Sequence, residues 1–450
     1  MEKKIYTVAV DLGSSNVVVI VGSKNDDGSL RIEKVVSKPA DGVNAGEIEN
    51  IASVGNSIRT AMQEVESALG IRVSEVYTGI SGRFMRCESY TDHVFTIDSQ
   101  SGVSQRDVDA LFERMANVQA PDDEIIMDRI PQNYMVDDDH EVKNPVGSFG
   151  KRLSSTFKFI LCKRTPLDRL RLAFNGLNIN LLGIYPSMLS SVEAVALPEE
   201  IEDGVAIVNL GGHKTDVTVV YKNVVRYIAS IPMGGEAINH DICTLSIPEK
   251  YVETLKQTFG SAVAALSDHK TIKIKGRTPR ESKCIQEYNL ATAIEARTMD
   301  IIDMVKDEIE ESGFAGKLTY GIVLTGAGAR MRNVDELFRR ETGLEVRISE
   351  HDVNLASEKP NRTYYPACST ALGLLILGIK DGRSTLVARQ MPQSVQHPAT
   401  APDPKPEPPK PEPPKPEPKP EPKPEPEEPV GGHGKIRGWG FKKWKRRFIR

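Results

Sequence analysis

Runs of apolar residues predict paired strands near the start of the chain. The β-branched segments Ile5–Val10 and Val17–Val21 flank the polar stretch Asp11–Asn16. Two short β-branched runs around a glycine-containing turn indicate a β-hairpin. Farther along, apolar residues recur every three or four positions over Ile51–Leu69. That spacing predicts an amphipathic helix.

The same hairpin pattern occurs a second time. The segments Val205–Leu210 and Val217–Tyr221 again flank a glycine turn, roughly 200 residues after the first hairpin. Repetition of a strand, glycine turn and strand at this distance predicts a duplicated fold with two similar lobes. Alternating strand and helix patterns continue to about Arg389, so we expect the folded region to end there.

The first turn has residue types suited to binding a phosphate. Gly13 lets the backbone approach an anion closely. Backbone N–H groups and the hydroxyls of Ser14 and Ser15 can donate to phosphate oxygens. Asp11 ends the strand, where it would reach Mg²⁺ through water. An ordinary hairpin can contain the same turn, so this motif alone leaves both interpretations open.

Two further glycine-rich turns follow strands. The second is Asn209-Leu210-Gly211-Gly212-His213-Lys214-Thr215-Asp216, inside the repeated hairpin. The third is Val323–Met331, between an apolar strand (Tyr320–Leu324) and a helix (about Asn333–Thr342). Small residues in that turn would let an adenine or ribose lie against the backbone. A packing turn between strand and helix is the alternative.

Composition narrows the classes of function. The net charge of -4 over 450 residues argues against a general nucleic-acid binder. The five cysteines are scattered and include no C-x-x-C pair, so we expect reduced thiols. The N-terminus has no signal-peptide pattern, and the longest apolar run, Ala371–Ile379, is too short to span a bilayer. We therefore expect a cytoplasmic protein whose membrane contact is peripheral.

The C-terminal part changes composition twice. Residues 390–430 repeat Lys-Pro-Glu-Pro, which predicts a disordered, extended linker. Residues 431–450 carry eight Lys or Arg and no acid. As a helix from Gly440, this tail would put aromatic residues on one face and basic residues on the other, which favours an interfacial membrane helix. The expected membrane-binding residues are Trp439, Phe441, Lys442, Lys443, Trp444, Arg446, Arg447 and Phe448. An RNA-binding tail and a helix for a partner's groove remain alternatives.

Together, the three turns resemble the two phosphate motifs and the adenosine motif of the actin, Hsp70 and sugar-kinase superfamily. Pro232-Met233-Gly234-Gly235 resembles the glycine pair after the superfamily's second hairpin. Glu253 and Lys256 resemble its ribose-holding pair, although an exposed intrahelical salt bridge has the same spacing. Glu295, placed before an expected helix over Thr298–Ser312, resembles another wall of the nucleotide pocket. The resemblance implies the following nucleotide-binding residues: Asp11, Gly13, Ser14, Ser15, Asn16, Asn209, Gly211, Gly212, Lys214, Gly234, Gly235, Glu253, Lys256, Glu295, Gly326, Gly328 and Arg330.

Within that superfamily, the chain resembles the FtsA family of bacterial cell-division proteins over roughly Ile5 to Gly378. Ile80-Ser81-Gly82 resembles the point where that family departs from the actin plan. Ile130-Pro131-Gln132-Asn133-Tyr134, Asn144-Pro145-Val146-Gly147 and Gly150-Lys151-Arg152-Leu153 resemble its inserted subdomain. Ala371-Leu372-Gly373-Leu374 resembles an interdomain connecting helix.

The resemblance implies an α/β fold: an actin-like, two-lobed arrangement of duplicated mixed β-sheets with flanking helices and an inserted small subdomain. The expected divisions are subdomain 1A at 1–83 and 163–197, the family-specific SHS2-like subdomain 1C at 84–162, subdomain 2A at 198–242 and 319–389, subdomain 2B at 243–318, the linker at 390–430 and the membrane-targeting helix at 431–450.

The second phosphate motif departs from the superfamily pattern. Asn209 stands where Asp is usual, and His213 and Lys214 stand where Gly and Thr are usual. Asn209 would still offer Mg²⁺ an oxygen, through water, but without negative charge. Lys214 could neutralise phosphate as a point charge, or it could point to solvent. Ile184-Tyr185-Pro186 also lacks the Gln or Glu that often orients water in relatives. We therefore expect binding of ATP with Mg²⁺, with weak or absent hydrolysis.

The family resemblance further implies a protein at the cytoplasmic side of the cell membrane at the division site. It would bind the C-terminal peptide of the tubulin-like FtsZ, self-associate into filaments, recruit later divisome proteins and contact anionic lipids, but not nucleic acid. Two alternatives stay open: a pilus-assembly type of actin homologue and a sugar-kinase-like phosphotransferase. The kinase needs a carboxylate base beside a sugar-sized pocket, and no insertion offers one.

Overall fold

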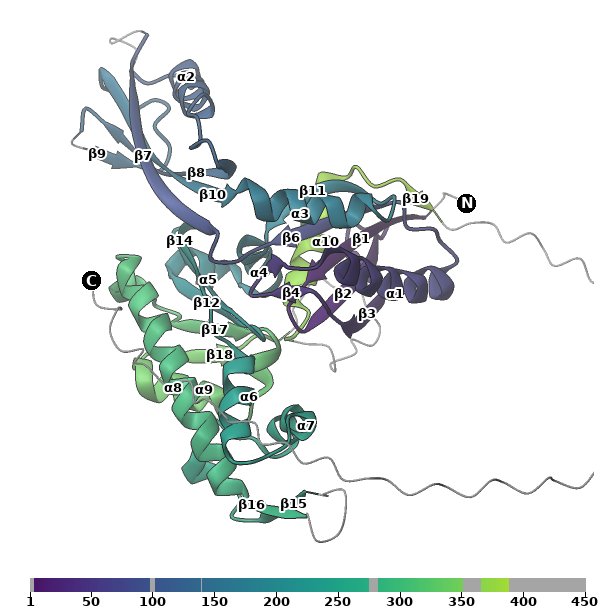
Figure 1. Ribbon diagram of the computed structural model, residues 1–450. Coiled ribbons are helices and arrows are strands. Elements are labelled where there is room, and N and C mark those ends of the chain that lie inside the picture. Colours follow the sequence, from purple (N-terminus) through teal and green to yellow (C-terminus); the bar gives the residue numbers. More distant parts are fainter. Residues whose placement is uncertain (1–3, 98–101, 139, 275–281, 351–365, 388–450) are drawn as a thin grey trace, which may run out of the picture. The chain divides into compact units, whose positions relative to one another are not determined.

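The computed structural model describes residues 4–97, 102–138, 140–274, 282–350 and 366–387. Two sheets of the same topology form its framework (Figure 1). In the first, the order is β11-β6-β1-β2-β3, and in the second it is β14-β13-β12-β17-β18. Each sheet begins with a three-stranded antiparallel meander and continues through two parallel strands. The duplication predicted from the two hairpins is confirmed.

The bounds of the strands show how each sheet is built from distant segments. The first sheet comprises β1 (Ile5–Leu12), β2 (Asn16–Lys24), β3 (Leu30–Pro39), β6 (Glu75–Ile80) and β11 (Asn180–Pro186). The short β19 (Leu386–Val387) pairs with β1. The second sheet comprises β12 (Val205–Leu210), β13 (Thr215–Tyr221), β14 (Val224–Ile231), β17 (Ile322–Thr325) and β18 (Val346–Ile348). We call these sheets and the helices packed on them the first and second lobes.

Helices cover both faces of the first sheet, which explains why the buried middle segments of β1 and β2 are almost entirely apolar. Val8 and Val10 lie in the core shared with α1 (Ile51–Leu69), whereas Ala9 lies in the core shared with α10 (Ser369–Asp381). Asn50 caps α1 by accepting from the N–H groups of Ala52 and Ser53, at 3.0 and 3.1 Å. The bounds of α1 are those predicted from its apolar spacing. The first lobe also contains β4 (Val43–Asn44), β5 (Glu47–Ile48), α3 (Arg164–Asn175) and α4 (Ser187–Val195).

The second lobe contains one long helix that the sequence interpretation placed wrongly. The expected helix over Thr298–Ser312 is the C-terminal half of α8 (Glu287–Glu311). Leu290 and Ile294 continue its buried stripe toward the N-terminus, so Glu295 lies inside the helix and not before it. The other elements of this lobe are α5 (Pro198–Asp203), α6 (Gly235–Thr244), α7 (Glu249–Phe259), η1 (Ala264–Leu266), β15 (Thr271–Ile274), β16 (Lys283–Gln286), η3 (Ala315–Lys317), η4 (Ala327–Arg330) and α9 (Val334–Thr342).

A small subdomain is inserted between β6 and α3. Its sheet has the order β7-β10-β8-β9, formed by β7 (Met85–Phe95), β8 (Glu124–Val136), β9 (His140–Val142) and β10 (Arg152–Lys163). The helix α2 (Gln105–Ala116) packs Leu111 and Met115 against this sheet. The buried Arg226 of β14 donates to the side-chain oxygen of Asn133 in β8 at 3.0 Å. The insertion is therefore bonded to the second lobe.

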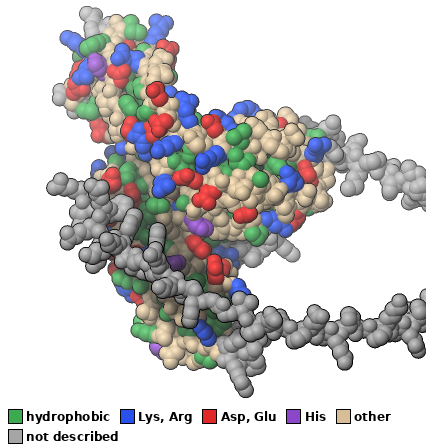
Figure 2. All heavy atoms as spheres, in the orientation of Figure 1, with side chains coloured by type: hydrophobic (Ala, Val, Ile, Leu, Met, Phe, Trp, Pro, Cys, Tyr) green, Lys and Arg blue, Asp and Glu red, His purple; other side chains and the backbone are tan. Residues whose placement is uncertain are grey.

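Surface charges do not form a field of one sign on the visible face. Figure 2 shows Lys and Arg interspersed with Asp and Glu there. This mixture agrees with the small net charge of -4. None of the described helices combines the length and the apolarity needed to cross a membrane. The predicted linker and membrane helix lie outside the described residues.

Candidate functional site

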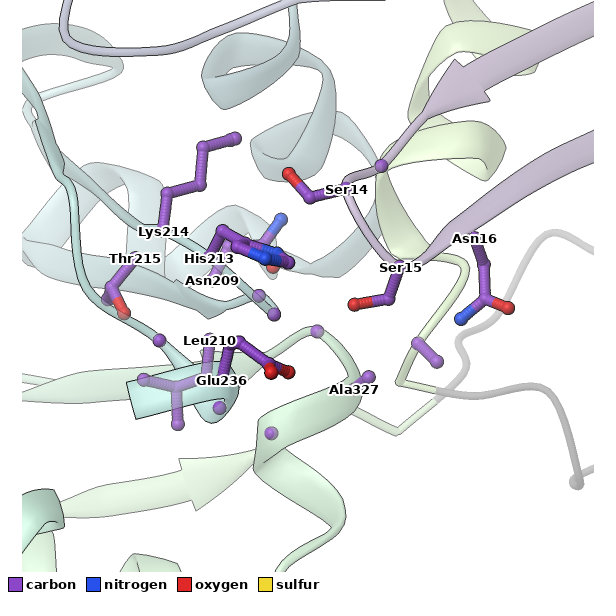
Figure 3. A pocket seen from close by; sticks show the side chains of 18 of the residues that line it. Ser14, Ser15, Asn16, Asn209, Leu210, His213, Lys214, Thr215, Glu236 and Ala327 are labelled. Carbon is purple, nitrogen blue, oxygen red and sulfur yellow. The ribbon is translucent and has the colours of Figure 1, made fainter. Parts of the chain in front are cut away.

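A cavity of about 960 Å³ opens where the three glycine-rich turns come together (Figure 3). The first turn joins β1 to β2, the second joins β12 to β13, and the third follows β17. The sequence-predicted nucleotide residues that line it are Asp11, Gly13, Ser14, Ser15, Asn16, Asn209, Gly211, Gly212, Lys214, Gly234, Gly235, Glu253, Lys256, Gly326, Gly328 and Arg330. Segments more than 300 residues apart in the sequence thus share one site.

Glu295 is the predicted residue that the fold does not bring to this cavity. Its carboxylate accepts from the backbone N–H of Ala264 at 2.9 Å and from the Arg340 guanidinium at 2.8 Å. Both partners belong to the packing between α8 and its neighbours in the second lobe. Because Glu295 lies within α8, the side of the helix on which its side chain lies is set by the helical repeat. The predicted helix began at Thr298, so it gave no side for Glu295.

The first turn presents a hydroxyl with no partner. The Gly13 N–H donates to the carbonyl of Asn16 at 3.0 Å and closes the turn. The Ser14 Oγ is buried and has no hydrogen-bond partner among the described residues. Figure 3 shows Ser14 and Ser15 projecting from this turn into the cavity. A buried hydroxyl without a partner is costly, so its position fits an incoming acceptor such as a phosphate oxygen.

The second turn lies directly against the first. A Cβ added at Gly212 would come 2.2 Å from the Ser15 Oγ, so the two turns approach each other closely at this point. His213 carries a second buried atom, its Nδ1, that has no hydrogen-bond partner within the described part of the chain. Behind the turn, the N–H groups of Gly235 and Glu236 donate to the carbonyls of Gly211 and Gly212 at 3.0 and 2.7 Å. The start of α6 therefore fixes the second turn in place.

A carboxylate, an ammonium and an amide stand at another wall of the cavity. Lys256 Nζ lies 2.7 Å from Glu253 Oε2 and donates to the carbonyl of Gly235 at 3.1 Å. Asn239 donates from its side chain to Glu253 at 2.8 Å and to Glu236 at 2.9 Å. Partial burial tends to raise the pKa of Glu253, but the bonds from Lys256, Asn239 and Gln257 hold it below its usual value. Glu253 and Lys256 thus form an intrahelical salt bridge that also faces the cavity.

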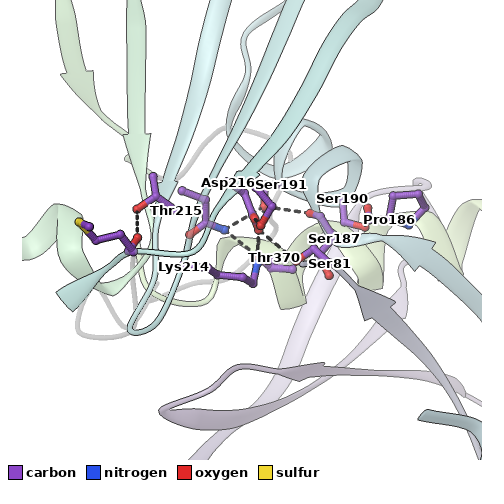
Figure 4. A network of polar contacts seen from close by, with 12 residues as sticks. Ser81, Pro186, Ser187, Ser190, Ser191, Lys214, Thr215, Asp216 and Thr370 are labelled. Carbon is purple, nitrogen blue, oxygen red and sulfur yellow. Dashed lines mark hydrogen bonds and ion pairs between the residues drawn. The ribbon is translucent and has the colours of Figure 1, made fainter. Parts of the chain in front are cut away.

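The two lobes are linked where Ser81 of the first lobe contacts an ion pair of the second lobe (Figure 4). Lys214 contacts the carboxylate of Asp216 and the hydroxyl of Ser81. The Ser81 hydroxyl also donates to Asp216 at 3.0 Å, and the Ser230 hydroxyl donates to its other oxygen at 2.7 Å. Ser81 follows β6 of the first lobe, whereas Lys214 and Asp216 belong to the second. Lys214 therefore does not point to solvent.

Asn209 of the second lobe bonds to α4 and α10, two helices of the first lobe that pack on each other. Its side-chain amide donates to the Thr370 hydroxyl of α10 at 3.0 Å and to the Ser191 hydroxyl of α4 at 3.3 Å. These two hydroxyls also lie 3.0 Å apart (Figure 4). The amide oxygen faces Gly326, where an added Cβ would lie 2.3 Å from it. The Asn209 side chain therefore contacts α4, α10 and the third turn. We call the crossing of α4 and α10 the hinge.

Sequence reasoning missed Asp216, Ser191, Thr370 and Asn239. Two of them carried a local signal: Asp216 ends the second glycine-rich turn, and Asn239 follows Gly235 by four positions and so lies on the same helical face. Ser191 and Thr370 meet across 179 positions of the chain. A pair at that separation has no periodic signature, and only the packing of α4 on α10 brings its members together.

Asp11 is the carboxylate at the end of β1 that faces this ion pair. Burial raises its pKa to about 6, against the attraction of Lys214 and with the repulsion of Asp216. In the folded protein the carboxyl therefore binds its proton more tightly than in the unfolded chain, where 3.8 is the ordinary value. Its contribution to stability is fully present below pH 3.8 and is lost as the pH rises through 6.

We predict that Asp11→Asn removes this pH dependence. The stability of the wild type relative to that of the variant should rise by about 1 kcal/mol as the pH falls from 8 to 5. Urea unfolding at several pH values measures the difference. The exposed Asp26 in the turn after β2 provides the matched control, and Asp26→Asn should leave the profile unchanged. The prediction would be contradicted if the difference in unfolding free energy between the wild type and Asp11→Asn stayed constant with pH.

The donor set at this end of the cavity does not fit the Mg²⁺ ion expected from the sequence. Asn209 donates its amide hydrogens to hydroxyls and has no charge. Both oxygens of Asp216 have partners within the protein. Among the described residues, no group of three or more His, Cys, Asp or Glu could hold a metal ion. Among the described residues, Asp11 is then the one carboxylate of the first two turns that lines the cavity and has no hydrogen-bond partner within the protein.

Two sheets of equal topology, joined by paired helices around a shared cavity, define an actin-like fold. The fold agrees with a solved structure, the PilM-PilN type IV pilus biogenesis complex, at a TM-score of 0.59. That similarity covers 83% of this chain and 98% of the other at 13% sequence identity. It concerns the fold alone.

The sequence comparisons identify the family. A family model described as "Cell division protein FtsA" matches residues 206–373, and one described as "SHS2 domain inserted in FTSA" matches residues 86–161. The Cell division protein FtsA of Pseudomonas aeruginosa is 28% identical over 387 residues, covering 85% of this chain and 92% of the relative. The Neisseria meningitidis protein is 29% identical over 378 residues, covering 83% and 90%. The chain belongs to the FtsA family of bacterial cell-division proteins.

Proposed function

We propose that this chain is an ATP-binding, actin-like protein that tethers the FtsZ division ring to the cytoplasmic membrane through its C-terminal helix. It binds the FtsZ C-terminal peptide, polymerises, and helps to recruit later divisome proteins at the division site. It hydrolyses ATP weakly or not at all. The observation that carries the nucleotide part is the cavity between the lobes, into which all three glycine turns converge.

The cavity has groups suited to each part of ATP. The hydroxyls of Ser14 and Ser15 and the backbone of the first two turns would hold the phosphates, since such groups form anion sites in turns. Glu253 and Lys256, with Asn239 bonded to Glu253, would bind the ribose hydroxyls. The turn from Gly326 to Arg330 would lie along the purine. The unpartnered atoms of Ser14 and His213 support this assignment.

Weak hydrolysis follows from the state of the polar groups near the phosphates. A water molecule that attacks a phosphate needs a base or an orienting acceptor. Asn209 is neutral and donates to the hinge hydroxyls, while Asp216 is 3% exposed and paired with Lys214. Tyr185 and Pro186 at the end of β11 add no acceptor side chain of the Gln or Glu type. The site is therefore better suited to holding ATP than to cleaving it.

The inserted subdomain supports the proposal of partner recruitment. Phe95, Ile97 and Phe149 are 71%, 71% and 80% exposed. They belong to neighbouring segments, because the N–H of Thr96 donates to the carbonyl of Lys151 at 2.9 Å. Large exposed apolar side chains that cluster on a surface are typical of protein interaction sites.

The nucleotide part is tested by measuring ATP affinity and phosphate release separately on the full chain. We expect saturable ATP binding and phosphate release far slower than that of an active kinase. Ser14→Ala should weaken ATP binding about tenfold, the effect of one lost charge-assisted hydrogen bond. Ser29→Ala in the distant β2–β3 turn is the matched control. Phosphate release at the rate of a kinase, or a cavity that takes no nucleotide, would refute this part of the proposal.

A further inference from the structure

Lys214 is a cation built into the phosphate end of the cavity. Its side chain lines the cavity yet is only 18% exposed, because it lies between Asp216 and Ser81. An ammonium group has three N–H donors. Two of them are accounted for by these partners among the described residues. One donor therefore remains for a ligand, even while the ion pair with Asp216 persists.

The surrounding carboxylates neutralise the Lys214 ammonium and leave little negative charge for a second cation. Asp216 accepts from Lys214, Ser81 and Ser230. Asp11 lies close enough to Lys214 for the charge of the ammonium to act on its carboxyl. A hydrated Mg²⁺ is usually held by one or two carboxylates together with the phosphates. Here it would share Asp11 with an ammonium group of the same sign, and repulsion in a partly buried site is strong.

We infer that this site binds a nucleoside triphosphate without a divalent cation, and that the Lys214 ammonium supplies the positive charge that a metal would otherwise bring to the phosphates. The inference rests on the proposed nucleotide function. Lysine acts on phosphate as a mobile point charge. Lys214 belongs to the second turn, whose Gly212 approaches Ser15 of the first turn closely.

This arrangement also connects the ligand to the lobes. Lys214 bonds Ser81 of the first lobe, and Asp216 keeps its bonds to Ser81 and Ser230 when the ammonium turns toward a phosphate. Phosphate, lysine and aspartate would then alternate in charge across the junction. Each buried charge retains a partner, as burial in a protein requires.

The decisive measurement is the affinity of the full-length wild type for ATP in excess Mg²⁺ and in EDTA, by isothermal titration calorimetry. We expect the two dissociation constants to agree within about threefold, which is less than the effect of one charge-assisted bond. If EDTA weakens binding tenfold or more, the inference is wrong while the proposed nucleotide function stands. If ATP binds under neither condition, the proposed function fails as well.

Variants identify the residue responsible. Lys214→Met with Asp216→Asn removes both charges, so neither is left buried alone. This double variant should lose about 10- to 100-fold in ATP affinity in EDTA and recover part of it when Mg²⁺ is added. Lys214→Arg keeps the charge and should remain independent of Mg²⁺. Lys24→Met with Asp26→Asn removes one exposed charge of each sign at the end of β2 and in the turn after it, and is the matched control for the double variant.

Thermal melting of each variant by circular dichroism reports whether it is folded. An affinity of the folded double variant in EDTA equal to that of the wild type would overturn the role of Lys214. Should the double variant not fold, the comparison of Mg²⁺ with EDTA on the wild type still decides the main claim, since it requires no substitution.

Discussion

Removal of residues 431–450 should abolish binding to anionic vesicles and leave the ATP affinity of the folded part unchanged. Each basic residue near an anionic surface contributes about 1 kcal/mol. Burial of Phe441, Trp444 and Phe448 adds a few kcal/mol more. The tail contains eight Lys or Arg and these three rings, so its loss removes the whole attraction. Co-sedimentation with phosphatidylglycerol vesicles measures the effect.

Two controls separate the tail from the linker and aromatic burial from charge. Deleting residues 405–424 shortens the chain by the same number of residues, keeps every aromatic residue and changes the net charge by only one unit. That variant should still sediment with vesicles. Alanine at Phe441, Trp444 and Phe448 together keeps all eight basic residues and should weaken binding about 100-fold or more. Membrane association of the tail-deleted chain would argue against the anchor.

The same vesicles test the tether. A labelled FtsZ C-terminal peptide should sediment with vesicles only when the full-length chain is present. With the tail-deleted chain, the peptide should stay in the supernatant although it still binds the protein in solution. No binding of the peptide to either form would contradict the FtsZ part of the proposal and leave the membrane part standing.

Gly373→Ala should be strongly destabilising, because α10 crosses α4 at this residue. An added Cβ would lie 1.7 Å from the carbonyl oxygen of Ser190 and 2.4 Å from its carbonyl carbon. Backbone atoms cannot move aside as a flexible side chain can. Forcing atoms into a packed contact costs about 1–3 kcal/mol, and we expect the upper end of that range. Urea unfolding gives the free energy directly.

The crossing of α4 and α10 also positions the site. Thr370, one turn before Gly373, and Ser191, next to Ser190, both bond to Asn209 in the second lobe. Separating the helices should therefore also weaken ATP binding, and Gly373→Ala should lose affinity together with stability. A variant that is destabilised but binds ATP as the wild type does would uncouple the hinge from the cavity.

Gly55 provides the matched control, since it lies in the interior of α1 and a Cβ there meets nothing within 4 Å. Alanine is favoured over glycine in a helix by roughly 1 kcal/mol. Gly55→Ala should therefore stabilise the protein. If Gly55→Ala and Gly373→Ala changed the free energy of unfolding equally, close packing against Ser190 would not restrict the residue at position 373.

The sequence by itself determined the local elements and their repetition. The apolar spacing of α1 lies within consecutive residues, and the helix has its predicted bounds. Both hairpins were readable because strand, glycine turn and strand are contiguous, and their repetition indicated two lobes. The composition of residues 390–450 separated linker from tail for the same reason, since charge and proline content are properties of short segments.

Only the tertiary structure decided what the polar groups of the turns contact. Lys214 was open between phosphate and solvent until the fold placed Ser81, 133 positions away, beside it. Asn209 was expected to face a metal, yet its amide bonds Thr370, 161 positions away. Glu295 was expected to line the site, but α8 begins at Glu287, so Glu295 lies inside that helix and does not line the cavity. Short-range patterns reflect contacts within one element, whereas a side chain's partners across the chain depend on how whole elements pack.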